Sequence, residues 1–270
     1  MKDLKFCKIT AQGNDYIYID ERSQKIDDDK RQELVKKLSN RRFGVGSDGV
    51  VFLQQTEFAD IRMKMFNSDG SVGKMCGSAL RSVVYLLSKE KEQAEYVVST
   101  DSGIRKGWLT ENGTSICVEM GRIIEYTRQN DTAGTYYIVN IGNLHKVWIS
   151  EILDAIRINS LIEMEQASGG ERYNLEFVEV FSSELIKIRI FESGSGFTYA
   201  CGSGAAASAF VCIMEKKVSG NKIKVKMPGG EVSVEFRDEK LFLTGKVKLI
   251  FKGIIEDADS FIITGNSGCE

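Results

Sequence analysis

Hydrophobic and polar residues alternate along two stretches of the chain that match each other without a gap. Residues 61–78 have the sequence IRMKMFNSDGSVGKMCGS and residues 186–203 have IKIRIFESGSGFTYACGS, at a constant offset of 125 residues. The alternation predicts a β-strand in each copy, because successive side chains of a strand point to opposite faces. A Gly/Ser-rich turn, a cysteine and an apolar run that predicts a helix follow, the helices being expected over 79–87 and 205–214. The pattern therefore predicts two equivalent halves, each with one thiol at the start of a helix.

The rest of the chain consists mainly of short strand patterns. Leucines at helical spacing among charges predict a surface helix over 28–39, and a second helix is expected over 151–165. Residues 11–15, AQGND, have the composition of a hairpin turn. Further strands are expected at 4–9, 16–19, 50–53, 96–100, 174–180, 223–227, 232–236 and 241–250, with a meander up to about residue 122 and a strand–turn–strand unit over 136–149. The pattern is that of a mixed α/β protein.

The duplication favours two similar domains over one large core. A chain of 270 residues with 42% hydrophobic content can form either. We place the boundary between a first half, 1–125, which carries Cys76, and a second half, 126–270, which carries Cys201. We leave open whether the last strand of the second half belongs to the sheet of the N-terminal domain.

Charge and hydropathy exclude several classes of partner. The net charge of −2 gives no electrostatic reason to expect binding to nucleic acid or to an anionic membrane. The first residues lead into a strand pattern and not into a signal peptide, and no apolar run approaches the ~20 residues of a membrane helix. We expect a cytoplasmic protein with a small-molecule partner, and leave open whether it forms a homodimer.

The cysteines do not form the pattern of a disulfide framework or a zinc site. The chain has Cys7, Cys76, Cys117, Cys201, Cys212 and Cys269, with no C-x-x-C motif and a single histidine, His145. Cys7, Cys117 and Cys212 lie in apolar patterns typical of buried positions, whereas Cys76 and Cys201 are surrounded by glycine and serine. The glycine-rich GVGSDG at 44–49 precedes a strand and lacks the Lys-Ser/Thr of a phosphate-binding loop, so no nucleotide site is expected there. A lone histidine beside a turn is more often structural than catalytic.

Two thiols at helix N-termini point to proton transfer at carbon. The positive end of a helix dipole lowers the pKa of a thiol, and the backbone amides that follow can bind a carboxylate. If two such sites face each other, one thiolate can remove a proton from Cα while the other thiol returns one from the opposite face. Glu192, which aligns with Asn67, could hold the ammonium group of an amino acid. The alternative is a duplication whose turns kept the same residues for backbone reasons alone.

Ordered motifs over nearly the whole chain resemble the diaminopimelate epimerase family of pyridoxal-phosphate-independent racemases. They are Gly13-Asn14-Asp15-Tyr16, Gly44-x-Gly46-x-Asp48, Phe66-Asn67-x-Asp69-Gly70, Cys76-Gly77, Gly142-Asn143-x-His145, Asn174-x-Glu176-Phe177-Val178, Ala200-Cys201-Gly202-x-Gly204 and Pro228-Gly229-Gly230. The resemblance implies two α/β (α+β) domains, each a curled, mostly antiparallel sheet around a central helix, with the site between them. It also implies that no cofactor or metal is used.

The resemblance also implies roles for particular residues. Cys76 and Cys201 correspond to the two catalytic bases of the family. Other positions correspond to substrate-binding residues: Gly77, Ser78, Gly202 and Ser203 at the reacting carboxylate, Asn14 and Glu192 at the reacting centre, and Asn67, Asn143, Asn174 and Ser193 toward the distal end of the substrate.

This chain departs from the family pattern in the distal subsite. Ser193 stands where the family has the arginine that holds the distal carboxylate of diaminopimelate, and serine cannot make that charge-assisted contact. Loss of such a contact costs on the order of 1.5–3 kcal/mol. The sequence therefore predicts an isomerase acting on diaminopimelate or on another amino acid. Two alternatives are an amino-acid-binding protein without turnover and a nucleophilic enzyme in which His145 activates one cysteine.

Overall fold

The computed structural model describes residues 3–110, 112–132 and 134–258 and divides into two compact units. The first unit comprises residues up to Ile116 together with those from Val247 onward, and the second comprises Cys117–Lys246. The division thus falls earlier than the 125/126 boundary expected from the repeat. The last described strand, β18 (Lys248–Ile255), pairs with β1 (Leu4–Ala11) and so belongs with the first unit. Cys269 lies outside the described residues.

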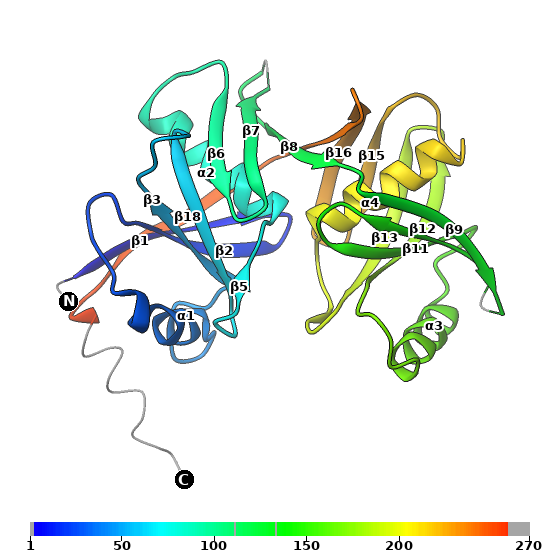
Figure 1. Ribbon diagram of the computed structural model, residues 1–270, viewed down its shortest axis with the longest axis horizontal. Coiled ribbons are helices and arrows are strands. Elements are labelled where there is room, and N and C mark those ends of the chain that lie inside the picture. The colour runs from blue at the N-terminus through cyan, green and yellow to red at the C-terminus, as the bar shows by residue number, and fades with distance from the viewer. Residues whose placement is uncertain (1–2, 111, 133, 259–270) are drawn as a thin grey trace, which may run out of the picture. The chain divides into compact units, whose positions relative to one another are not determined.

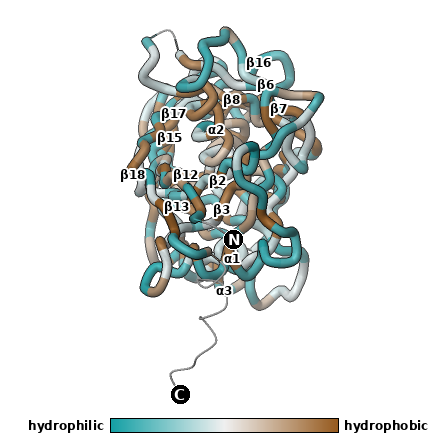
Figure 2. Tube along the Cα trace, turned by 90° about the vertical axis from the view of Figure 1, so that its left-hand side faces the viewer, coloured by the Kyte–Doolittle hydropathy of each residue, from teal (hydrophilic) through white to brown (hydrophobic). Residues whose placement is uncertain are grey.

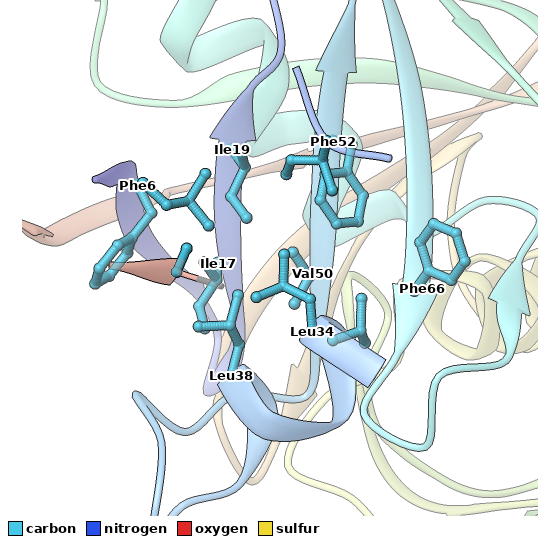
Figure 3. Packing of buried hydrophobic residues seen from close by; sticks show 12 residues of the cluster. Phe6, Ile17, Ile19, Leu34, Leu38, Val50, Phe52 and Phe66 are labelled. Atoms are coloured by element: carbon cyan, nitrogen blue, oxygen red, sulfur yellow. The ribbon is translucent and has the colours of Figure 1, made fainter. Parts of the chain in front are cut away.

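In the first unit, strands pair in the order β18–β1–β2–β3–β4–β6–β7, with the short β5 beside β4. The strands are β2 (Asn14–Asp20), β3 (Gly49–Gln54), β4 (Ile61–Asn67), β5 (Val72–Gly73), β6 (Tyr96–Thr100) and β7 (Gly103–Leu109). Helix α2 (Gly77–Glu90) packs against β1, β6 and β7, while α1 (Arg31–Ser39), preceded by the 3-10 turn η1 (Asp28–Lys30), packs against β3 and β4. Leu34 and Leu38 of α1 cover Ile17 and Val50 of the sheet (Figure 3).

In the second unit, strands curve around a single apolar helix. Helix α4 (Gly202–Met214) contacts strands on several sides and is buried from Gly202 to Cys212, as expected for a helix that is apolar around its circumference (Figure 1). The strands are β8 (Ile116–Arg122), β9 (Glu125–Asp131), β10 (Gly134–Asn140), β11 (Leu144–Ser150), β12 (Asn174–Ser182), β13 (Leu185–Glu192), β14 (Gly196–Phe197), β15 (Lys222–Met227), β16 (Gly230–Arg237) and β17 (Lys240–Gly245). Most neighbours are antiparallel, but β11–β12 and β13–β15 are parallel. Helix α3 (Ala155–Ala167) covers Trp148 and Phe177.

The predicted repeat is present as the same succession of elements, β4–β5–α2 and β13–β14–α4. Figure 2 colours the chain by hydropathy. Burial alternates along β4 in the first unit and β15 in the second, whereas β2 and β3 are buried almost throughout. The expected α/β class is confirmed. No helix among the described residues is long and apolar enough to cross a membrane.

Three expected boundaries were wrong for identifiable physical reasons. The helix expected from residue 151 begins at Ala155, because Asp154 caps it by accepting hydrogen bonds from Ile156 N and Arg157 N. The strand expected over 241–250 is two strands, β17 and β18, which pair in different units. The hairpin turn is confined to Gln12 and Gly13, with φ of 54° and 85°, so the flanking strands are longer than expected.

Candidate functional site

Cys76 is the residue that caps the N-terminus of α2. Its backbone is extended (φ −136°, ψ 126°), and its carbonyl oxygen accepts the first helical hydrogen bond from Leu80 N at 2.8 Å. The side chain does not cap the helix, so the sulfur is left to other partners. The first N–H groups of a helix have no partner within it, and here they belong to the buried Gly77 and Ser78. These groups can bind an anion next to the sulfur.

Two neutral side chains donate hydrogen bonds to the Cys76 sulfur. Asn14 Nδ2 donates to Cys76 Sγ at 3.7 Å, and Tyr16 makes a side-chain hydrogen bond to the same sulfur. Burial raises the pKa of Tyr16 well above its ordinary value, so the phenol stays protonated and donates. Asn14 begins β2 directly after the hairpin turn, and its Oδ1 is buried with no hydrogen-bond partner among the described residues. A ligand donor could bind this oxygen.

Cys201 caps α4 with nearly the same backbone conformation (φ −134°, ψ 117°) but in different surroundings. Its Sγ accepts from Gly204 N at 3.4 Å and lies 3.3 Å from Ser203 Oγ. Only 7% of the residue is exposed. Burial, followed by the charges of Glu192 and Glu176, raises the pKa of the Cys201 thiol well above its ordinary value.

The prediction that a helix N-terminus would lower the pKa was therefore wrong for Cys201. Desolvation of the thiolate and two nearby carboxylates outweigh the helix dipole and the hydrogen bonds from Ser203 and Gly204. In the resting second unit, Cys201 is a thiol.

Glu192 ends β13 and faces Cys201. Burial raises the pKa of Glu192, while hydrogen bonds from Thr198 and Cys201 oppose that rise. Asn67, at the aligned position of the first unit, is exposed, and its Nδ2 donates to Ser71 Oγ at 2.9 Å. The two aligned positions therefore differ in both charge and surroundings.

The residues assigned to the distal subsite in the second unit are near the surface. The Ser193 backbone N–H donates to Asn174 Oδ1 at 3.1 Å, which joins the turn after β13 to the start of β12. Gly194 and Gly196 give that turn its positive φ values of 90° and 76°. Asn143 lies in the exposed turn between β10 and β11. The structure thus brings Glu192 and Ser203 to Cys201 and Asn14 to Cys76, while Gly202 begins α4 and Gly77 and Ser78 begin α2, directly after the two cysteines. Asn174 and Ser193 contact each other.

Two residues near the thiols were missed as site candidates. Tyr16 was treated only as part of a motif, and so was Glu176, which is completely buried with Oε1 2.8 Å from His145 Nδ1. A signal for Glu176 was available, because both faces of the strand around it are apolar (Leu175, Phe177, Val178) and any charge there must be buried. Within the described residues, no group of three or more His, Cys, Asp or Glu side chains is placed to hold a metal ion.

Comparisons with known proteins agree with the motifs. The family model described as diaminopimelate epimerase matches residues 6–124 and 137–250. A diaminopimelate epimerase of Methanococcus maripaludis is 34% identical over 280 residues, covering 94% of this chain and 100% of the relative. A diaminopimelate epimerase of Parabacteroides distasonis is 34% identical over 273 residues, covering 94% of this chain and 99% of the relative.

Solved structures show the same fold at low sequence identity. A PhzF-family phenazine biosynthesis protein of Bacillus anthracis superposes with a TM-score of 0.72 at 16% identity, covering 94% of this chain and 99% of the other. A hydroxyproline epimerase of Agrobacterium vitis, solved with trans-4-hydroxy-L-proline, superposes with a TM-score of 0.70 at 13% identity, covering 96% and 95%. At these identities the likeness establishes the fold alone.

Proposed function

Because the chain belongs to the diaminopimelate epimerase family and is an isomerase, we propose that it inverts the Cα of an amino acid without a cofactor, using Cys76 and Cys201. The observation that carries the proposal is the repeated cysteine at the N-cap position of a helix, followed in each unit by buried Gly-Ser residues. A duplication retained for backbone reasons accounts for glycine and serine in these turns. It does not account for a matched pair of thiols.

The proposed reaction consists of two proton transfers at one carbon. A thiolate takes the α-proton and becomes a thiol, the electron pair of the C–H bond remains on the substrate, and the second thiol gives its proton to the opposite face. The N–H groups of the first turns of α2 and α4 hold the α-carboxylate, onto which negative charge develops. Preorganised donors of this kind stabilise the transition state because they need no reorientation during the reaction.

The surroundings of the thiols suggest how the roles are divided. The Cys201 thiol has a raised pKa, so it holds its proton in the resting enzyme and acts first as the donor. Cys76, which receives hydrogen bonds from Asn14 and Tyr16, acts first as the acceptor. Glu192 would hold the substrate ammonium group, and that cation would in turn offset the carboxylate charge next to Cys201.

For the substrate, the proposal covers diaminopimelate or, given Ser193, an amino acid without a distal carboxylate. The relatives' names favour the first, and the absence of the family arginine favours the second. Arg62, one cation that could have replaced that arginine, is paired with Asp101. A Ser193→Arg variant separates the two substrates: it should raise kcat/KM for diaminopimelate if a distal carboxylate is the missing contact, and lower it for a neutral side chain.

The test of the reaction is exchange of the α-proton in deuterium oxide, followed by mass spectrometry for each of the common amino acids and for diaminopimelate. Cys76→Ser and Cys201→Ser should each reduce inversion by ~10²–10⁴-fold, because a general acid or base is removed. Cys7→Ser, a thiol outside both sites, is the matched control and should change little. Tight binding without exchange would instead indicate a binding protein, and dependence on one cysteine alone would indicate a nucleophilic enzyme.

A further inference from the structure

The turn that precedes Asn14 holds a residue in an unusual backbone conformation. Gln12 has a φ of 54°, in the left-handed region that few side chains adopt, and Gly13 follows with a φ of 85°. These two residues form the loop of the β1–β2 hairpin, in which Ala11 pairs with Asn14. Because such a conformation persists only where the surrounding structure holds it, the contacts of the Gln12 side chain are informative.

The side chain of Gln12 is bound by a buried cation. Arg81 of α2 is 1% exposed, and its Nη2 donates to Gln12 Oε1. A guanidinium keeps its charge when it is buried, and a hydrogen bond from a charged donor is stronger than one between neutral groups. Since α2 begins directly after Cys76, this contact ties the turn to the same helix as the thiol.

The turn leads directly to a donor of the Cys76 sulfur. Asn14 is two residues after Gln12, and its Nδ2 donates to Cys76 Sγ at 3.7 Å. Two contacts therefore join the hairpin to the N-terminal part of α2, one from Gln12 and one from Asn14, with Gly13 alone between these two residues. The position of the Asn14 amide next to the sulfur thus depends on the conformation of residues 12 and 13.

The two units can be compared position by position through their strand pairing. The repeat aligns Met65 with Ile190. Their partners on the neighbouring strands are Val51 and Glu176, which are therefore counterparts. The helices align by the same offset, Ala79 with Gly204 and Arg81 with Ala206.

The hairpins correspond as well. Tyr18 is the partner of Val51 on β2, and Val147 is the partner of Glu176 on β11. Counting back from Tyr18 and Val147 matches three further pairs: Tyr16 with His145, Asn14 with Asn143, and Gln12 with Ile141.

Both members of the Gln12–Arg81 contact are replaced in the second unit. Their counterparts, Ile141 and Ala206, are buried, with 5% and 0% exposure. Neither side chain has a polar group, so a contact of this kind cannot form between them. The two positions therefore differ together, as a hydrogen-bonded pair in one unit and an apolar pair in the other.

The turn and its asparagine differ in the same way. In the second unit β10 and β11 are joined by Ile141, Gly142 and Asn143, and Gly142 has a φ of 103°. Asn143 lies in this turn and is exposed, whereas Asn14 begins β2, is half-buried and contacts the thiol. The Gln12–Arg81 contact thus occurs in the unit whose asparagine reaches its cysteine.

We propose that Gln12 is a positioning residue for proton transfer at Cys76: anchored by the buried Arg81, it holds the turn in its left-handed form and so keeps the Asn14 amide on the sulfur. A hydrogen bond from this amide favours the thiolate, the form in which Cys76 accepts the α-proton. The inference rests on the proposed function, because it concerns the same thiol.

The first test is the alkylation of Cys76 by iodoacetamide across a pH series in Gln12→Leu, since leucine is similar in size and has no acceptor for Arg81. We expect the midpoint of the Cys76 profile to move up by about half to one pH unit, a ~3–10-fold slower reaction at a fixed pH below it, as the thiolate loses a donor. Cys201 in the same sample should not change. A looser site without this role would change the rate at every pH and leave the midpoint in place, and that result would overturn the inference.

The comparison is made with the other charged and titratable groups intact. Tyr16 and Tyr18 of β2 both interact with Cys76, Asp48 acts on Tyr16, and Arg81 acts on Tyr18. None of them is altered by a substitution of Gln12. A moved midpoint therefore reports the loss of the Gln12 contact and its effect on Asn14.

Two further variants separate the side-chain contact from the backbone conformation. Gln12→Gly adopts a positive φ readily but has no side chain for Arg81, and we expect its midpoint to move in the same direction. If Gln12→Leu moves the midpoint and Gln12→Gly does not, the backbone alone is responsible and the inference is wrong. Asp238→Leu is the matched control, because Asp238 (φ 51°) opens a two-residue turn of the β16–β17 hairpin in the second unit, and it should leave Cys76 unchanged.

A double-mutant cycle tests whether Gln12 acts through Asn14. Gln12→Leu and Asn14→Ala should each lower kcat/KM for α-proton exchange by ~10-fold or more, and the double variant should lose little beyond Asn14→Ala. Fully additive losses would contradict the proposal. Cys7 of β1, whose pKa is raised by burial to about 11, should stay slow to alkylate in each variant, which shows that the sheet remains closed.

The outcomes separate the two proposals, because alkylation requires no turnover. If the unmodified protein exchanges no α-proton while Gln12→Leu moves the Cys76 midpoint, the proposed function fails and the positioning of Asn14 stands. If exchange occurs and the midpoint does not move, the inference fails and the two-thiol reaction is intact.

Discussion

Cys76 and Cys201 occupy the same position of a repeat, with backbone angles that differ by less than about ten degrees, yet their chemical surroundings are unlike. Neutral donors from Asn14 and Tyr16 contact the first sulfur. The second sulfur is more deeply buried and is influenced by two carboxylates. A duplicated backbone thus supplies two thiols in position, while the side chains beneath each helix set their protonation. When the environments of two titratable groups shift their pKa values apart, one group can act as the acid and the other as the base.

The largest expected effect comes from transferring the carboxylate to the first unit. Val51→Glu would bury a charge beside Tyr16 in place of histidine and under Ala79 in place of glycine. Because no partner or space is provided, we expect a loss of ~3–5 kcal/mol in the free energy of unfolding, measured by urea titration. Val51→Gln, of similar size but uncharged, should cost less. Equal losses would show that space alone distinguishes the two units at this position.

Exchange of the small helix residues should have a smaller effect. Gly204→Ala places a Cβ 2.5 Å from a carboxylate oxygen that is held by His145, and we expect a cost of ~1–3 kcal/mol. In an unconstrained helix the same change stabilises by about 1 kcal/mol, and Ala79→Gly in the first unit should lose about that amount. Urea titration of both variants measures the contrast. A stabilised Gly204→Ala protein would contradict the close approach of Glu176 to the helix.

The reactivity of the two thiols should differ by about tenfold or more at neutral pH, which corresponds to ~1.4 kcal/mol. Iodoacetamide alkylates thiolates. Because the pKa of Cys201 is raised, its thiolate forms only at higher pH, and Cys76 should react first. Burial raises the pKa of Cys7 to about 11 and that of Cys212 to about 12, so both serve as slow internal references. Peptide mapping across a pH series gives each rate.

A variant identifies the cause of this difference. Glu192→Gln removes the largest electrostatic contribution to the raised pKa of Cys201, and should make Cys201 react at lower pH without changing Cys76. If Cys201 is the faster thiol in the unmodified protein, the assignment of donor and acceptor must be reversed.

The sequence was sufficient for features that depend on local pattern. The alternation of Ile61, Met63 and Met65 predicted a strand, and the small residues after Cys76 predicted a helix start. The repeat predicted the duplicated succession of elements, because a gapless offset leaves each aligned residue in the same local setting. The two matched cysteines were predicted at the starts of two helices, and both occupy the N-cap position.

The sequence pattern could not predict features that depend on contacts between strands distant in the chain. The raised pKa of Cys201 results first from burial and then from the charges of Glu192 and Glu176, and Glu176, 25 residues earlier in the chain, is brought to this region by the pairing of β12 with β13. The return of β18 to β1 joins residues at opposite ends of the chain, and nothing local at Lys248 indicates it. The argument from the helix dipole considered only the thiol and its own helix. The pKa of Cys201 is determined mainly by burial and by carboxylates on the neighbouring strands.

The smallest expected effect concerns Tyr16, one of the two neutral donors to the Cys76 sulfur. Tyr16→Phe removes one hydroxyl that donates to the Cys76 sulfur and leaves the buried ring in place. A single hydrogen bond of this kind is worth about 0.5–1.5 kcal/mol, so alkylation of Cys76 at fixed pH should slow by roughly two- to tenfold as its thiolate loses a donor. Cys201 in the same sample is the internal control and should not change. Faster alkylation of Cys76 would mean that the phenol shields the sulfur instead of stabilising its charge, and Asn14 would then be the group that supports the thiolate.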